Sequence, residues 1–259
     1  MVLAIGAFAL AGCNIGEYQF TEVEGRGGWR AEKERACMAT RELSDSIVQV
    51  DAIVEEIECG MDFPLEVSAL SSSTVVVSPK ATIGCPLTDK LEDWIAGSVQ
   101  PAAQSKFGSK VVEIKQISAY ACRKRNNFGK EFSEHAFGNA LDIAGFKLAN
   151  GREFSIAGGW KGDAQEQAFL REVFAGACER FTTTLGPGSN ILHYNHIHMD
   201  LAQLAPDGSP KMCKPPPQGG VPAVAATPAP TPAAADGATP PVTAEPEIIP
   251  ADTATPGAD

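Results

Sequence analysis

Residues 191–201 read ILHYNHIHMDL, and residues 133–143 read SEHAFGNALDI. In the first of these stretches His196, His198 and Asp200 alternate with apolar residues. Successive side chains of a β-strand point to opposite faces of the sheet, so the alternation predicts a strand over residues 191–201 with one polar and one apolar face. We expect the two histidines and the aspartate to project into one cavity, while the apolar side chains pack behind them.

All four histidines of the chain lie in these two stretches, which indicates a shared site. His135 and Asp142 are too far apart for one helical turn, and Gly138 between them suits a tight turn into a strand that presents Asp142. Two imidazoles and a carboxylate leave a fourth position for water, as catalytic zinc sites do, and zinc lowers the pKa of that water to about 7. The pattern therefore predicts a metal centre. Zn2+ is the first choice, although nickel, cobalt and copper accept similar ligands. The alternative is that the histidines are ordinary polar residues of the surface or core.

Hydrophobic and charge periodicity predicts the other elements of the domain. Helices are predicted over residues 29–42, 87–103 and 163–181, the last ending before Gly186-Pro187-Gly188. Strands are predicted over residues 110–121, 141–146 and 153–157, and Asn150-Gly151 is a strong hairpin-turn signal between the last two. Helices and short strands in this order predict an α+β domain with a small antiparallel sheet and flanking helices.

The composition excludes several classes of protein and divides the chain. The net charge is −11, from 21 basic and 32 acidic residues, which argues against a protein that binds nucleic-acid phosphates. No apolar run reaches the roughly 20 residues that span a bilayer. Residues 215–259 hold 12 of the 19 prolines and no Lys, Arg or aromatic residue, so we expect a disordered tail. A folded domain is expected over residues 29–214, after a linker at residues 14–28.

The chain opens with the apolar segment MVLAIGAFALAGCNIG. Small residues after an apolar run are typical of a secretory signal, and Leu10-Ala11-Gly12-Cys13 is similar to the bacterial lipobox, whose cysteine is acylated. We therefore expect residues 1–13 to be a lipoprotein signal that ends at Cys13. A lipid on Cys13 would anchor the exported protein to a membrane, with the protein facing the periplasm. Asn14 after the cysteine favours the outer membrane in a Gram-negative cell. No Lys or Arg precedes the run, so we expect the true start upstream of Met1; the alternative is a buried N-terminal element.

Six cysteines remain after Cys13, and an even number in an exported chain predicts three disulfides. Their spacing contains no C-x2-C pair, which argues against a cysteine zinc site. Fifteen pairings are possible, and all stay open at this point. The candidates are Cys37, Cys59, Cys85, Cys122, Cys178 and Cys213.

The two histidine stretches also resemble known families. SEHAFGNALDI resembles the S-x-H-x6-D signature of the LAS metallopeptidases, which include the D-Ala-D-Ala peptidases and the penicillin-insensitive murein endopeptidases. The H-x2-H-x-H spacing of residues 193–198 is most similar to that of the murein endopeptidases. Residues 29–201 resemble more closely the bacterial extensin-like C-terminal domain family, which carries a Tyr-x-Cys-Arg strand, here residues 120–123. These resemblances imply a LAS or hedgehog-type metallopeptidase-like fold.

The resemblance assigns roles to individual residues. It implies that His135, Asp142 and His198 are the zinc ligands, and that His196 hydrogen-bonds the attacking water or the carbonyl oxygen. His193 occupies the place where many LAS peptidases have a glutamate base, and a histidine with a pKa near 6.5 is able to act as a base at neutral pH. By strand parity His193 lies off the face of His196 and His198, so we expect it on the turn that enters the strand.

The remaining site residues are expected around this centre. The resemblance implies that Arg123 or Arg125 corresponds to an arginine of the relatives that faces the substrate, where a guanidinium suits a peptide carboxylate. The alternative is an exposed arginine without a functional role. Ser133 either hydrogen-bonds the substrate or caps the turn. Asp200 is expected to hold a ligand imidazole in place without touching the metal.

The sequence and its resemblances predict a zinc peptidase of the bacterial cell envelope that acts on peptidoglycan stem peptides or cross-links. A first alternative is a metal-stabilised peptidoglycan-binding or structural lipoprotein that has lost turnover, because the carboxylate base is missing. A second alternative is a metal carrier of the envelope.

Overall fold

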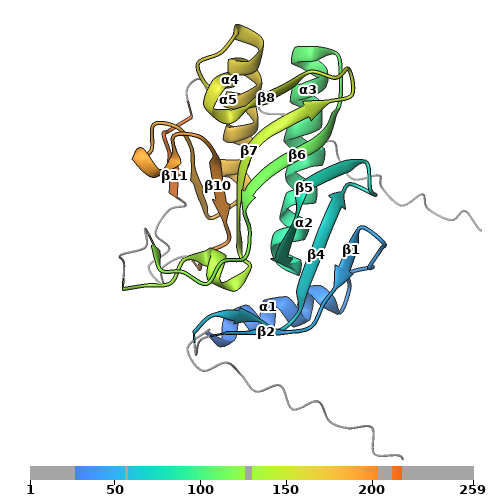
Figure 1. Ribbon diagram of the computed structural model, residues 1–259, viewed down its shortest axis with the longest axis vertical. Helices are drawn as coiled ribbons and strands as arrows, with labels where there is room; N and C mark the ends of the chain where they lie inside the picture. The colour runs from blue at the N-terminus through green and yellow to red at the C-terminus, as the bar shows by residue number, and fades with distance from the viewer. Residues whose placement is uncertain (1–26, 56–57, 126–129, 204–211, 218–259) are drawn as a thin grey trace, which may run out of the picture. The chain divides into compact units, whose positions relative to one another are not determined.

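The computed structural model describes residues 27–55, 58–125, 130–203 and 212–217 (Figure 1). Cys13, most of the predicted linker and nearly all of the predicted tail lie outside these ranges. All the described residues belong to one compact unit. Their elements are α1 Gly28–Met38, β1 Ile47–Gln49, β2 Ile53–Val54, β3 Gly60–Met61, β4 Pro64–Leu70, β5 Val75–Gly84, α2 Cys85–Trp94, η1 Ile95–Val99, α3 Gln100–Phe107, β6 Val111–Ser118, η3 Glu134–Phe137, β7 Ala140–Leu148, β8 Glu153–Ser155, α4 Ile156–Gly159, α5 Ala164–Arg180, β9 Thr183–Leu185, η4 Ile191–His193, β10 Ile197–Asp200 and β11 Met212–Lys214.

The main sheet has nine strands, in the order β1-β4-β5-β6-β7-β10-β9-β11, with β8 paired to β7. Its pairings are antiparallel except for β5 with β6 and β9 with β11. The α+β class and the mainly antiparallel pairing are confirmed, whereas the prediction of a small sheet is wrong. The difference comes chiefly from residues 47–84, for which no strand was predicted: β1, β4 and β5 of this sheet form there, and β2 and β3 pair in a separate two-stranded sheet.

The strands of this N-terminal region alternate imperfectly. In β4 the buried residues Leu65, Val67 and Ala69 alternate with Glu66 and Ser68. The register of β4 against β5 shifts between Val67 and Ala69, however, so no single alternating pattern runs through the pair. Between these two pairs β4 advances by two residues and β5 by five, from Ala81 to Val76. The irregularity therefore lies in β5, where Pro79 and Lys80 are both exposed and interrupt the period of two.

The predicted helices form, with different ends. The first helix is shorter than expected, since α1 ends at Met38 and Arg41 beyond it turns to pair with Asp89 and Glu92 of α2. The helix predicted over residues 87–103 spans α2, the π-helical η1 and α3. The π-helical turn ends at Val99, two residues before Pro101, which has no N–H for a regular helical hydrogen bond. No helix in the described part of the chain is long and apolar enough to cross a membrane.

The C-terminal half follows the sequence pattern more closely. The predicted hairpin is formed by β7 and β8, and Gly151 in its turn has φ 87°. The predicted helix over residues 163–181 is α5, whose first turn is capped when the Asp163 carboxylate accepts a hydrogen bond from the Glu166 amide. The predicted terminal strand is wrong in its length: β10 covers only Ile197–Asp200, and residues 191–193 form a 3-10 turn.

One apolar core holds the sheet and helices together. Phe169 of α5 packs edge-to-face against Phe146 of β7, with ring centroids 5.1 Å apart. Figure 1 shows α2 and α3 running beside the central strands of the sheet. Three disulfides are confirmed, and their pairing is Cys37–Cys85, Cys59–Cys122 and Cys178–Cys213.

Candidate metal centre

Two of the predicted ligands face each other across neighbouring strands. Asp142 of β7 and His198 of β10 are directly opposed in the antiparallel register. Directly opposed side chains lie on the same face of the sheet, with Cβ atoms about 5 Å apart. The pairing of β7 with β10 therefore brings together two residues that are 56 positions apart in the sequence.

The third predicted ligand, His135, lies on the short helix η3. Ser133 caps this helix, since its hydroxyl accepts the His135 amide at 3.4 Å, so the structure places Ser133 in the capping role. Gly138 ends the helix with φ 60°, a left-handed conformation that favours glycine. A side chain at Gly138 would meet the Met61 sulfur at 2.3 Å. The predicted tight turn is thus confirmed, and it delivers the chain from His135 into β7.

Three potential ligand atoms converge at the meeting point of η3, β7 and β10. His135 Nε2 lies 3.2 Å from His198 Nδ1 and 3.2 Å from Asp142 Oδ1. Asp142 Oδ1 and His198 Nδ1 are 2.8 Å apart. All three residues are buried. Their grouping is one that could hold a metal ion.

The other nitrogen of each ligand imidazole has its own partner. His135 Nδ1 lies 2.7 Å from the carbonyl oxygen of Ala119, to which it donates, so in the neutral ring Nε2 carries the lone pair that a metal ion would use. His198 Nε2 lies 3.0 Å from Asp200 Oδ2. Metal-binding histidines typically donate their second ring N–H to a carbonyl or carboxylate in this way. The donor set therefore fits a divalent metal ion, and Asp200 occupies the supporting place predicted for it.

The electrostatics of the cluster follow from this crowding. Burial alone would raise the pKa of Asp142, but hydrogen bonds with His135 and His198 lower it far below its ordinary value. Burial alone would lower the pKa of His198, yet hydrogen bonds to Asp142 and Asp200 raise it to about 9. Without a metal, a proton on His198 therefore supplies the positive charge that holds the two carboxylates beside it.

The other two histidines surround the centre without joining it. His196 Nε2 is 3.7 Å from Asp142 Oδ1, and the ring of His193 lies 5.0 Å from that of His196. Burial lowers the pKa of both rings, that of His193 to about 4. His193 lies at the end of η4, on the turn entering β10, as parity predicted. Both rings are consequently neutral at physiological pH and able to accept a proton.

The centre forms the floor of a cleft of about 530 Å³. One side is basic: Arg123 Nη2 is 4.0 Å from Asp142 Oδ2, and Arg125 pairs with Glu131 at 3.2 Å. The guanidinium of Arg123 is partly exposed. Another part of the lining is apolar and consists of Leu185, Leu192 and Met212. The cleft thus presents a cationic and an aliphatic region beside the three converging ligand atoms.

Sequence reasoning missed several residues that support this site. Glu134, which is 4% exposed, accepts a hydrogen bond from Arg30 of α1 at 2.6 Å and another from the Asn139 amide at 2.7 Å. The amide oxygens of Asn190 and Asn195 face Nδ1 of His193 and His196, at 2.7 and 2.9 Å. The two asparagines could have been suspected from the sequence, because each stands within three residues of a histidine of the second motif.

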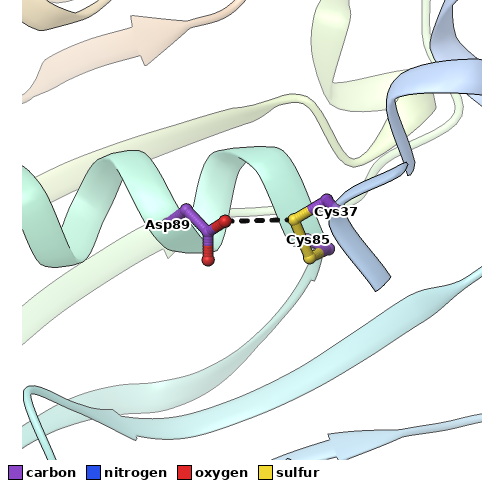
Figure 2. Close-up of side chains that lie close together, drawn as sticks. All are labelled: Cys37, Cys85 and Asp89. Carbon is purple, nitrogen blue, oxygen red and sulfur yellow. Dashed lines mark hydrogen bonds between the residues drawn. A yellow bond between two sulfur atoms is a disulfide. The ribbon is translucent and has the colours of Figure 1, made fainter. Parts of the chain in front are cut away.

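A second grouping of potential metal ligands has a simpler explanation. Cys37, Cys85 and Asp89 lie close together (Figure 2), but the two cysteines form a disulfide. The Cys37 sulfur is 3.1 Å from an Asp89 oxygen, and a disulfide sulfur has neither a proton to donate nor a thiolate to bind metal. Burial raises the pKa of Asp89, although the neighbouring Arg41 opposes this. The grouping is a covalent link between α1 and α2.

Comparison with known proteins identifies the family of the chain. No curated protein matches it, and no solved structure matches it. A family model described as extensin-like protein C-terminus matches residues 35–214. This match covers the described sheet from β1 to β11 together with the residues of the metal centre, and so the chain belongs to the extensin-like C-terminal family.

Proposed function

We propose that the protein is a zinc-dependent peptidase of the bacterial cell envelope that hydrolyses amide bonds in peptidoglycan stem peptides or cross-links. The observation that carries the proposal is the convergence of His135 Nε2, Asp142 Oδ1 and His198 Nδ1 at the floor of a cleft. The resemblance to the LAS metallopeptidases supplies the reaction class. The signal-like segment, the lipobox-like cysteine and the disulfides support an envelope location.

Zinc is the ion that best fits two imidazoles and one carboxylate with an open position. When bound, it would polarise the substrate carbonyl and lower the pKa of a water. The residues of the chain would perform the proton transfers. In the hydrolysis the amide C–N bond breaks: the hydroxyl of water goes to the carbonyl carbon and its proton to the departing amine. The neutral rings of His193 and His196 lie where they could accept that proton and return it.

The cleft also supports a peptide as the substrate. The exposed part of the Arg123 guanidinium suits a carboxylate of the peptide, and the apolar region suits an aliphatic side chain. Ser133 caps η3, which supports a structural role for this residue. The net charge of −11 provides no support for a nucleic-acid partner.

Release of soluble muropeptides from purified sacculi tests the proposal. The wild-type protein loaded with zinc should release peptide fragments, and His135→Ala should release none. Lys80→Gln, which alters an exposed ion pair with Glu66, is a matched control and should keep full activity. Equal release by the wild type and His135→Ala would end the peptidase proposal.

A second candidate is a metal-stabilised protein that binds peptidoglycan without hydrolysis. The observation that favours it is the absence of a carboxylate at the position of His193. Elemental analysis and sacculus sedimentation separate the two. This candidate predicts one zinc per chain, loss of that zinc in Asp142→Ala, and binding to sacculi without hydrolysis. Zinc binding with neither sacculus binding nor hydrolysis would favour a metal carrier.

The location is tested separately from the chemistry. Cells expressing the full chain and fed a radiolabelled fatty acid should label the protein through Cys13, and Cys13→Ala should remove the label. Recovery of the labelled protein in the outer-membrane fraction is the expected result. An unlabelled protein in the cytosolic fraction would contradict the envelope assignment.

A further inference from the structure

Asn190 has a bonding pattern that defines the proton position on His193. Its amide oxygen Oδ1 accepts the backbone N–H of Leu192 at 2.8 Å. The same oxygen lies 2.7 Å from His193 Nδ1. Asn190 is the residue that caps η4, and His193 is the last residue of that short helix. In a 3-10 helix, side chains three residues apart stand on the same edge, which places this amide beside the ring.

The backbone amide makes the assignment unambiguous. A peptide N–H only donates, so the side-chain atom that receives it is the oxygen and not the nitrogen of the asparagine amide. An amide oxygen only accepts, so His193 Nδ1 must carry the hydrogen of the second bond. The neutral ring then has its lone pair on Nε2, and among the described residues Nε2 of His193 makes no hydrogen bond.

We infer that Asn190 is a positioning residue, which holds neutral His193 in the Nδ1–H tautomer and leaves Nε2 as a proton acceptor in the metal-centre cleft. The inference deepens the proposed peptidase function, on which its catalytic consequence rests. Free neutral imidazole in water carries its proton mainly on Nε2, the opposite arrangement. Without Asn190 the ring would mostly present a donor where the reaction needs an acceptor. His193 lines the cleft and lies outside the ligand group, although its ring is edge-on to that of His198 with centroids 5.8 Å apart, so the effect on catalysis is measured beside zinc content.

Two substitutions distinguish this role from simple capping. Asn190→Ser keeps a good helix cap but has a shorter side chain that leaves the ring nitrogen without its acceptor. Asn190→Asp keeps both the cap and the acceptor oxygen. Asn195→Ser is a matched control, because Asn195 faces His196 and not His193.

Long-range proton–nitrogen NMR spectra of histidine-labelled full chain report the tautomer directly. Each ring is assigned by its own His→Gln variant, at pH 7.5. We expect His193 in the Nδ1–H form in the wild type and in Asn190→Asp, and mainly in the Nε2–H form in Asn190→Ser. Asn195→Ser should leave His193 unchanged. An Nε2–H form in the wild type, or an Nδ1–H form that survives in Asn190→Ser, would overturn the inference.

Kinetics then test the consequence. With the zinc-loaded protein, Asn190→Ser should lower kcat by about tenfold with little change in KM, as expected for the weakening of a general base, and Asn190→Asp should restore most of it. Zinc content should be equal in the wild type, Asn190→Ser and Asn190→Asp. A wild type without hydrolysis would refute the proposed function, while the tautomer spectra would still decide the role of Asn190. An unchanged kcat in Asn190→Ser with an altered tautomer would overturn the positioning role.

Discussion

His198 stands between two carboxylates, and this position would link proton binding to the proposed metal binding. Its Nδ1 is 2.8 Å from Asp142 and its Nε2 is 3.0 Å from Asp200, which raises its pKa to about 9. The raised value means that protonated His198 stabilises the metal-free fold below pH 6.5, and that this contribution is lost as the pH rises towards 9. A metal ligand must have a free lone pair, so zinc and this proton compete for Nδ1.

The first prediction concerns this competition. Zinc binding at pH 7.5 should release close to one proton, and zinc affinity should rise by up to about tenfold per pH unit until pH 9. Calorimetry in buffers of different ionisation enthalpy measures the proton release. Asp200→Asn removes one of the charges that raise the His198 pKa, so this variant should release fewer protons. Binding without proton release at pH 7.5 would contradict the assignment of His198 as a ligand.

The second prediction concerns the support of the ligand by Asp200. Asp200→Asn should lower zinc affinity by about 10–100-fold, because the carboxylate orients the His198 ring and increases its basicity. Competition with a chromophoric chelator measures the effect. His193→Gln is the control: the His193 ring lies edge-on to that of His198, with centroids 5.8 Å apart, but it is outside the ligand group, so zinc affinity should change much less than in Asp200→Asn. A loss of affinity in the control alone would mean that the ligand set differs from the one proposed.

At the scale of single elements, η3 is held from two sides. The buried Glu134 carboxylate binds Arg30 of α1 and the Asn139 amide, and Arg30 also stacks on the Phe137 ring at 4.0 Å. On the other side, Gly138 packs against Met61 of β3. The short helix carries His135, so these contacts of neighbouring elements determine where one ligand lies.

The third prediction tests the ion pair. Glu134→Gln removes the carboxylate charge that faces Arg30 in a largely buried place, and should lower the free energy of unfolding by about 3 kcal/mol. Urea denaturation measures it. Glu66→Gln breaks an ion pair with Lys80, whose side chain is 61% exposed. This variant should lower the free energy of unfolding by less than about 1 kcal/mol. Similar costs for the two variants would argue against a buried anchor.

The fourth prediction tests the close approach at Gly138. Gly138→Ala and Gly108→Ala both place alanine at a φ near 60°, but only Gly138 has a neighbour, the Met61 side chain at 2.3 Å, whereas Gly108 has open space around it. Both variants should lose about 1 kcal/mol from the left-handed conformation, and Gly138→Ala should lose more because it overpacks. Thermal melts measure the difference. Adding Met61→Ala should recover part of the excess, and no recovery would exclude this clash as its cause.

At the scale of the whole molecule, the disulfides connect elements that are distant in the sequence. Cys59–Cys122 links the region of β3 to the segment that follows β6, and that segment supplies the Ala119 carbonyl bound by His135. The buried residues around this disulfide include Ala136 and Phe137 of η3. The bridge therefore constrains the backbone on which one ligand is oriented.

The fifth prediction follows from this arrangement. Replacing Cys59 and Cys122 together by serine should lower the free energy of unfolding by about 2–5 kcal/mol and also weaken zinc binding. Replacing Cys178 and Cys213, which link α5 to β11 and are not in the cluster around η3, should cost a similar stability with little effect on zinc affinity. Denaturant titration and chelator competition give the two quantities. Equal losses of zinc affinity in both double variants would contradict a specific role for Cys59–Cys122.

Much of the candidate site was predictable from local patterns. The alternation of His196, His198 and Asp200, and the turn at Gly138, depend on the strand period and on backbone sterics, which act over a few residues. These patterns placed His193 on a turn, and the resemblance to the LAS metallopeptidases grouped His135, Asp142 and His198, which lie together in the structure. The metal and the reaction stay predictions.

The strands β1 to β5 and the exact length of β10 were decided by the tertiary structure. A strand is stabilised by partners that lie far away in the sequence, and the register shift between β4 and β5 interrupts the alternation in β5. Pairing of the cysteines is decided in the same way, since only the folded chain brings particular sulfur atoms within bonding distance.

The sequence by itself determined which side chains are available as metal ligands, because the histidines and carboxylates, and their alternation with apolar residues, lie in two short stretches. The tertiary structure alone decided what surrounds those ligands: the Ala119 carbonyl, Arg30 with Glu134, and the asparagines beside His193 and His196. The physical reason is range. Alternation acts along one strand, whereas hydrogen-bond partners are selected by packing in three dimensions.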